Sequence, residues 1–143
     1  MDFWLGRWEV TFAGADGAPV TGTNTVSEHE GRIYELFVAP DDGAQYVGAS
    51  VTHHDHEHGR WMQEYWDNQG YRAWYEGGWH GDRFILDVTG RGGQAAGSKR
   101  LVWRDITSDA LVWENERTTD GGRTWASTWT IGYRRLPTAA GEP

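Results

Sequence analysis

The chain of 143 residues contains no cysteine, a single lysine at position 99 and no long apolar run. Without cysteine it can form no disulfide, no thiol nucleophile and no thiolate metal site. Its apolar runs are far shorter than the ~20 residues that a membrane helix needs, so no membrane partner is expected. The start, Met1-Asp2, lacks the basic stretch of a signal peptide, and we expect a cytoplasmic location.

Positive charge is scarce. Thirteen Lys and Arg residues face 21 Asp and Glu residues, which gives a formal net charge of −8. Proteins that bind a phosphate backbone need a basic stripe, so nucleic acid is not an expected partner. The length fits one domain, and we predict a single domain over 1–136 with a small, polar and flexible tail over 137–143.

Aromatic residues and glycines dominate what is present, with ten tryptophans and 20 glycines. Thr, Val, Trp and Tyr fill the segments between spaced glycines, which is typical of short strands with turns at about 8–12 residue intervals. This pattern predicts ten strands, over 4–13, 19–29, 32–39, 44–54, 60–67, 71–79, 83–90, 98–107, 110–118 and 124–135.

The turns between these segments are short, as in Gly14-Ala15-Asp16-Gly17 and Asp67-Asn68-Gln69-Gly70. Short connections force sequential strands to pair antiparallel. Ten strands in a meander are best accommodated by closing on themselves. The sequence therefore predicts an all-β fold, a ten-stranded up-and-down antiparallel β-barrel.

Alternation along the strands assigns the inward faces, although strands 32–39 and 44–54 are apolar on both faces. In the last strand, Trp125, Ser127, Trp129, Ile131 and Tyr133 are expected to share the inward face. The predicted interior also contains several polar side chains among the rings. Buried polar groups need partners, either one another or a ligand. We expect a ligand-binding set of Asn24, Gln63, Tyr65, Tyr75, Asn115 and Trp129; the alternative is a filled core in which these groups bond to each other.

Four motifs carry a family resemblance: Phe3-x-x-Gly6-x-Trp8, Trp61-x-Gln63-x-Tyr65-x-Asp67, Asp120-Gly121-Gly122-Arg123-Thr124-Trp125 and Tyr133-x-Arg135. Together they resemble the calycin superfamily and, within it, a lipocalin-like bacterial domain family of unknown function. The middle motif departs from the family pattern, because Tyr65 stands where a second Trp is usual. The resemblance implies a barrel with a cavity, and Arg135 of the last strand over Trp8 of the first, closing one end by a cation–π contact.

The chain contains candidate metal ligands but no candidate axial histidine for haem late in the sequence. His54, His56 and His58 lie on one side of an extended segment and could bind Zn or Ni, but a solvated turn at the strand end is the more usual explanation of such a run. Nitrobindin-like barrels, which share the Gly-x-Trp start, hold haem through a late His, whereas the last His here is His80. No cofactor is expected.

Catalytic signatures are sparse. Glu35 is the candidate general acid or base, because it shares a face with Ile33 and Phe37 and a buried carboxyl has a raised pKa. The other strand glutamates are expected to pair with arginines on the surface. The segment from Thr118 to Trp125 matches an Asp-box, and we interpret it as a structural turn capped by Asp120.

Three functions remain open on the sequence. The first is binding of a small apolar or aromatic molecule inside a Trp-lined barrel. The second is a cofactor-free enzyme, an isomerase, cyclase or hydrolase acting on a hydrophobic natural-product-like substrate. The third is a partner-binding module that uses exposed tryptophans. The sequence does not decide whether a reaction is catalysed, and a homodimer is possible.

Overall fold

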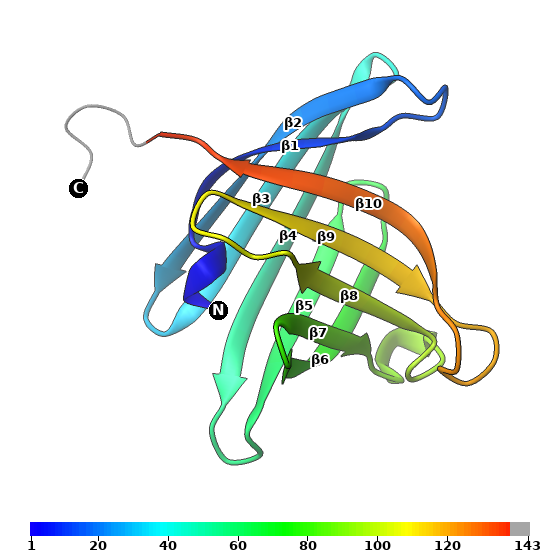
Figure 1. The fold of residues 1–143 in the computed structure, drawn as a ribbon. Helices are drawn as coiled ribbons and strands as arrows, with labels where there is room; N and C mark the ends of the chain where they lie inside the picture. Colours follow the sequence, from blue (N-terminus) through cyan, green and yellow to red (C-terminus); the bar gives the residue numbers. More distant parts are fainter. Residues whose placement is uncertain (138–143) are drawn as a thin grey trace.

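The computed structural model describes residues 1–137, and its ten strands close into one barrel (Figure 1). Each strand pairs antiparallel with its neighbour in sequence, and the first pairs with the last. This confirms the predicted all-β, up-and-down barrel. The elements are η1 (Asp2–Trp4), β1 (Gly6–Ala13), β2 (Pro19–His29), β3 (Arg32–Asp41), β4 (Ala44–Asp55), β5 (Arg60–Asp67), β6 (Arg72–His80), β7 (Arg83–Val88), η2 (Arg91–Gly93), β8 (Lys99–Arg104), β9 (Ala110–Arg117) and β10 (Ala126–Arg135). The predicted tail lies, except for residue 137, outside the described residues.

Up-and-down order gives the barrel two distinct ends. We call the end that contains η1, the start of β1 and the end of β10 the closed end. The opposite end, which we call the open end, carries the β1–β2, β3–β4, β5–β6, β7–β8 and β9–β10 connections (Figure 1). None of the helices described within 1–137 is long and apolar enough to cross a membrane.

The first strand starts later than predicted. Trp4, expected in the first strand, lies in η1 and is buried, and β1 begins only at Gly6. Gly6 has a φ of 130°, a backbone conformation that residues other than glycine rarely adopt. A Cβ at this position would also overlap the Arg135 guanidinium. The glycine of the Gly-x-Trp motif is therefore required both by its backbone and by the space that Arg135 occupies.

A β-bulge reverses the faces at the start of β10. The pairing of β10 with β9 shifts register between Ser127 and Trp129. One extra residue inverts the alternation. Ser127 consequently bonds to Thr130 on the outer face, and Trp125 lies outside under Arg100, with 4.0 Å from the guanidinium carbon to the ring centre. The prediction that Trp125 and Ser127 face inward with Trp129 was wrong.

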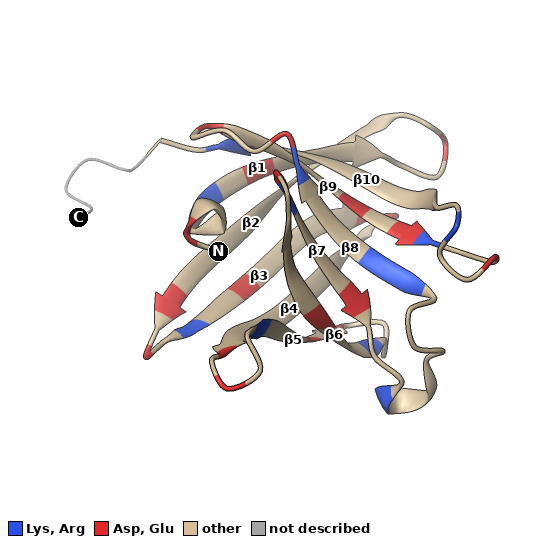
Figure 2. Cartoon of the chain, turned by 60° about the horizontal axis from the view of Figure 1, so that its bottom comes forward, with Lys and Arg blue, Asp and Glu red and all other residues tan. Residues whose placement is uncertain are grey.

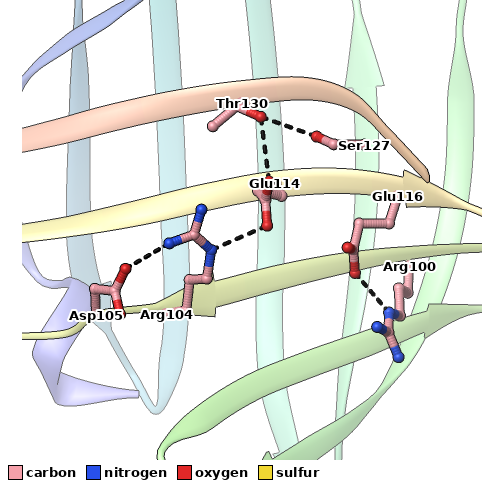
Figure 3. A network of polar contacts seen from close by, with 7 residues as sticks. All are labelled: Arg100, Arg104, Asp105, Glu114, Glu116, Ser127 and Thr130. Carbon is pink, nitrogen blue, oxygen red and sulfur yellow. Dashed lines mark hydrogen bonds and ion pairs between the residues drawn. The ribbon is translucent and has the colours of Figure 1, made fainter. Parts of the chain in front are cut away.

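Ion pairs join β8 and β9 across the outer face of the barrel, and Thr130 of β10 adds a hydrogen bond to Glu114 (Figure 3). Arg100 Nε donates to Glu116 at 2.7 Å, and Arg104 Nε donates to Glu114 at 3.0 Å. Arg104 lowers the pKa of Glu114 by hydrogen bonding to its carboxylate. Figure 2 shows the basic start of β8 beside the acidic end of β9. As predicted, these strand glutamates pair with arginines on the surface.

The core fills the closed end of the barrel. Trp4, Trp8, Trp103, Phe84 and Leu86 are at most 1% exposed. Aromatic rings in this core meet edge to face, which is the arrangement that aromatic quadrupoles favour. In the Trp4–Trp103 pair the ring centres lie 5.4 Å apart and the ring planes form an angle of 77°. Large rings fill this part of the barrel, and the aromatic-lined cavity lies toward the other end.

Candidate functional site

A cavity of about 370 Å³ occupies the open half of the barrel. It is lined mainly by aromatic rings and reaches the surface at Gln69, an exposed residue of the β5–β6 turn. Its volume lies in the range of about 300–1,000 Å³ that small-molecule sites occupy. The rings are Phe37, Tyr46, Tyr65, Tyr71, Tyr75, Trp103, Trp113, Trp129 and Tyr133, and the other lining residues are Glu35, Gln63, Asp67, Gln69, Leu101, Asn115 and Ile131.

The lining differs from the expected tryptophan wall. Five of the six tyrosines line the cavity, but only three of the ten tryptophans do. The other tryptophans pack at the closed end or lie outside, where Trp66 is 40% exposed. A tyrosine wall presents hydroxyl groups as well as rings, so it suits a ligand with polar substituents.

Five of the six predicted ligand-binding residues line this one cavity: Gln63, Tyr65, Tyr75, Asn115 and Trp129. Asn24 is inward and fully buried, as predicted, but does not line the cavity. Its amide is bonded to Glu35 and Tyr133, which both line the cavity. Asn24 therefore supports the wall from behind, because its amide is bonded to two side chains of the lining.

Several polar groups of the wall satisfy one another, as the alternative interpretation expected. The Tyr71 and Tyr75 hydroxyls lie 3.3 Å apart, and the Tyr46 and Tyr65 hydroxyls are bonded to each other. Gln63 Nε2 donates to Thr52 at 3.0 Å. Burial raises the pKa of Tyr46, Tyr65 and Tyr75 above the usual range. These hydroxyls therefore remain protonated and polar at neutral pH.

Among the residues that the structure describes, two amide oxygens of the lining are left without a hydrogen-bond partner. The Oδ1 atom of Asn115 is buried and accepts no hydrogen bond within residues 1–137. Within the same range the structure gives no bond to Gln63 Oε1. A buried acceptor without a donor costs about 1–3 kcal/mol. Both amides are therefore suited to accept hydrogen bonds from a ligand.

Trp129 is fixed rigidly in the wall of the cavity. Four rings meet it at ring-centre distances between 5.2 and 5.8 Å and at angles of 75° or more, namely those of Phe12, Phe37, Tyr46 and Trp113. Rings held this way lose little further conformational freedom when a ligand binds, which favours affinity.

Charged groups stand where the cavity opens. Asp67 accepts hydrogen bonds from the backbone amides of Gln69 and Tyr71 and from the Tyr46 hydroxyl. Lys99, the single lysine, donates to the Tyr71 hydroxyl, and its ammonium lies 4.4 Å from the centre of that ring. The entrance thus carries one anionic side chain, bonded to Tyr46, and one cationic side chain, bonded to Tyr71.

Glu35 lies deep in the cavity, on the inward face of β3. Ser50 Oγ donates to one carboxyl oxygen at 2.7 Å and Asn24 Nδ2 to the other at 2.8 Å. Desolvation by burial raises the pKa of Glu35 to about 7, although both hydrogen bonds oppose the shift. The side chain remains half-buried, because the cavity gives access to it. It can therefore gain or lose a proton near neutral pH.

Sequence reasoning missed several wall residues. Tyr46 lies on β4, one of the two strands whose faces were ambiguous, and only its pairing with β3 and β5 places it inside. Ser50 was missed for the same reason. Tyr133 was placed inward by alternation, yet nothing in the sequence connected it with Asn24, which lies far away along the chain.

The closed end contains the pair that the resemblance implied. Trp8 is fully buried, and the Arg135 guanidinium carbon lies 4.1 Å from the centre of its ring. The Arg135 guanidinium also donates to the carbonyl oxygens of Leu5 at 2.5 Å, Phe3 at 3.2 Å and Ser108 at 2.7 Å. Arg135 therefore ties the start of the chain to β10 and to the β8–β9 turn.

The histidine run does not assemble a metal centre. His54 Nδ1 and His56 Nδ1 lie 2.8 Å apart, whereas His58 Nδ1 turns away to Asp55 at 2.8 Å. Within 1–137 no group of three or more His, Cys, Asp or Glu side chains could hold a metal ion. The three histidines proposed from the sequence are therefore divided between two separate contacts.

Comparisons with known proteins support the fold alone. No protein-family model matches the chain, and no curated protein matches it either. Among solved structures, the chain is similar to a de novo designed fluorescence-activating β-barrel, with a TM-score of 0.51 and 16% identity over 94% of this chain and 95% of that one. The shared feature is the closed antiparallel barrel.

Proposed function

We propose that this barrel binds a small aromatic molecule carrying polar groups, which enters at the open end. The observation that carries the proposal is the 370 Å³ cavity, in which ring walls surround Glu35 and the unpartnered Asn115 acceptor. Burying apolar ligand surface contributes about 25 cal/mol per Å², and convergent polar atoms fix the orientation. The same argument disfavours a filled core, because a filled core would leave no such space.

We also propose that the chain is a calycin-type barrel. Support comes from the Trp8–Arg135 pair, which closes the barrel end as the resemblance implies. In such an arrangement one end is sealed by packing and the other admits the ligand. The proposed binding site agrees with this polarity.

Titration with N-phenyl-1-naphthylamine tests the binding proposal. This neutral probe has two aromatic groups and one N–H donor, which the Gln63 and Asn115 amide oxygens can accept. Binding should be saturable, with quenching of tryptophan fluorescence and a dissociation constant at or below about tens of micromolar, or ~6–7 kcal/mol. Native mass spectrometry of freshly purified protein would show whether a natural ligand is retained.

Substitutions in the cavity wall test whether the probe binds inside the cavity. Gln63→Leu should weaken binding by about 1–3 kcal/mol and leave the melting temperature nearly unchanged. Trp129→Ala should weaken both binding and stability, because four rings pack against this indole. Trp66→Ala, on the outer face of β5, is the matched control and should leave binding intact. Absence of saturable binding, or equal losses for Trp66→Ala and Trp129→Ala, would contradict the proposal.

A cofactor-free enzyme is the second candidate. The observation that favours it is the buried Glu35 carboxyl, which faces the cavity and has a pKa near 7. Carboxyl groups tuned in this way act as general acids or bases. The two candidates share one site and differ in whether the bound molecule exchanges a proton with Glu35.

A further inference from the structure

Two oxygen atoms of the cavity wall are held by the same amide nitrogen. Asn24 Nδ2 donates to Glu35 Oε2 and to the Tyr133 hydroxyl, at 2.8 Å in each case. Asn24 is fully buried and the two acceptors line the cavity. The amide thus fixes a carboxyl from β3 and a phenol from β10 side by side, across β2 and β1, which separate these strands in the barrel.

This arrangement assigns the direction of each proton. Because the Tyr133 oxygen accepts from Asn24, its own O–H proton is directed elsewhere. Within residues 1–137 the structure gives no acceptor for that proton, and Tyr133 lines the cavity. Burial, reinforced by the nearby Glu35 charge, raises the pKa of Tyr133 well above its usual value. The phenol is therefore a permanent hydrogen-bond donor available to a bound molecule.

The Glu35 carboxyl has the complementary role. Asn24 and Ser50 each occupy one lone pair, one on each oxygen, and a carboxylate offers further acceptor sites. The ionisable groups that face it are the phenols of Tyr46, Tyr65 and Tyr133. Burial raises the pKa of all three, so Glu35 is the group of this cluster that titrates near pH 7.

We propose that Glu35 and Tyr133 form a proton-transfer site for an enolisable ketone attached to an aromatic ring. The inference rests on the proposed function, because the ketone must occupy the same cavity. A ketone presents its α hydrogen and its carbonyl oxygen on adjacent carbons, and so it can reach a base and a donor that stand side by side. The ring walls would hold the aromatic part of the molecule.

The proposed step balances without a co-reactant. The Glu35 carboxylate takes a proton from the α carbon, and the electron pair of the broken C–H bond forms the C=C bond of an enolate. The carbonyl π pair moves to oxygen, where the Tyr133 O–H donates a hydrogen bond to the developing negative charge. The Glu35 carboxylic acid then returns the proton to the same carbon. Where the ketone also carries a C=C bond conjugated with the enolate, return of the proton to the far end of that system shifts the position of the C=C bond.

Hydrogen exchange on 2-tetralone in D₂O, followed by NMR, tests the step. The C1 hydrogens of this bicyclic ketone lie between the carbonyl and the ring and are acidic. The protein should accelerate their exchange saturably above the buffer rate. For the wild type, the rate constant at saturation should rise with pH and level off above about pH 7, as Glu35 loses its proton.

Variants distinguish the roles of the two groups. Glu35→Gln should lower the exchange rate by about 100-fold or more and abolish its pH dependence, as expected for loss of a general base. Tyr133→Phe should lower it by at least about tenfold through loss of the oxyanion donor. Both variants should still bind 2-tetralone, as measured by tryptophan quenching. Glu57→Gln in the β4–β5 turn and Tyr34→Phe on the outer face of β3 are matched controls and should exchange at the wild-type rate.

The outcomes separate the two proposals. If 2-tetralone binds but wild type and Glu35→Gln exchange at equal rates, the proton-transfer site is overturned and the binding function stands. Loss of exchange in Glu35→Gln with full exchange in Tyr133→Phe overturns the assigned pair. If neither 2-tetralone nor N-phenyl-1-naphthylamine binds the folded wild type, both proposals are overturned.

Discussion

The Arg135 guanidinium lies over the Trp8 ring, with its carbon 4.1 Å from the ring centre. The two residues are also partners in the register between β10 and β1. Trp8 Nε1 donates to the Trp4 carbonyl at 2.9 Å, and Arg135 holds the carbonyls of Phe3 and Leu5. One cation therefore organises both the seam of the barrel and the segment that covers its closed end.

Replacing Trp8 tests this arrangement. Trp8→Ala should lower the free energy of unfolding by about 3–5 kcal/mol, as large aromatic truncations in a core do. Urea unfolding monitored by circular dichroism measures the loss. Trp66→Ala on the outer face should cost far less, because Trp66 is 40% exposed. An unfolding midpoint that does not change for Trp8→Ala would show that the indole does not stabilise the closed end.

Glu35 should make stability depend on pH. Its folded pKa, about 7, lies above the ordinary value of 4.5, so the folded state holds the proton more tightly. This contribution to stability is present in full below about pH 4.5 and is lost as pH rises through 7. Relative to Glu35→Gln, the wild type should lose about 3 kcal/mol between pH 4.5 and 8.

Denaturant unfolding of both proteins across this pH range measures the difference, and most other ionisable groups cancel in the comparison. Above pH 7 the Gln variant should be the more stable of the two, because it buries no charge. A difference that stays constant with pH would mean that Glu35 titrates normally.

Gly48 makes room for a wall residue. A Cβ at this position of β4 would overlap the Tyr65 hydroxyl and lie 3.1 Å from the adjoining ring carbon. Gly48→Ala should therefore displace Tyr65, break its bond to Tyr46 and cost about 1–3 kcal/mol, as overpacking does. In a Tyr65→Phe background, which lacks the hydroxyl, the same substitution should cost less. Thermal unfolding of the double-mutant cycle measures the coupling, and strict additivity would argue against this contact.

Asp120 stabilises the turn between β9 and β10. It accepts hydrogen bonds from the Thr124 amide at 2.9 Å, the Thr124 hydroxyl at 2.5 Å and the Thr118 hydroxyl at 2.8 Å. These bonds lower the pKa of Asp120 to about 2, from an ordinary value of 3.8. The stabilisation should be complete above about pH 4 and disappear as pH falls through 2.

Asp120→Asn should accordingly lower the melting temperature at pH 7, with a smaller difference at pH 2.5. Asp82→Asn, in the β6–β7 turn, is the control, since within 1–137 no hydrogen bond to the Asp82 side chain is found. Equal differences at both pH values would show that the charge of Asp120 contributes nothing.

Local patterns predicted what depends on neighbours in sequence. Alternation correctly placed Asn24, Phe84, Leu101 and Tyr133 inside, because each strand there is regular and has one polar face. Alternation failed at Trp125, because the bulge between Ser127 and Trp129 shifts the inward positions by one residue and no residue type in the sequence marks it. It gave no answer for β3 and β4, whose outer faces carry exposed apolar side chains such as Leu36, which is 50% exposed.

The site depended on relationships that a single sequence does not display. Glu35 was selected because Ile33 and Phe37 share its face, and the structure places it in the cavity. Its partners were not predictable, because Ser50 and Asn24 reach it from other strands and Tyr133 joins the cluster only through Asn24. Register across four pairs of neighbouring strands, from β10 through β1, β2 and β3 to β4, determines that cluster, and register follows from the closed barrel as a whole.

The seam between β1 and β10 also bears on how the chain reaches its native state. Every other strand pairing joins consecutive segments, whereas this one joins opposite ends of the described chain. Bringing such distant segments together is slow, because the loss of chain entropy precedes the gain from contact. Until the seam forms, β1 and β10 each expose unpaired backbone groups that can associate with another molecule. Refolding yield should therefore fall as protein concentration rises, and variants that weaken the Trp8–Arg135 contact should be the most sensitive to it.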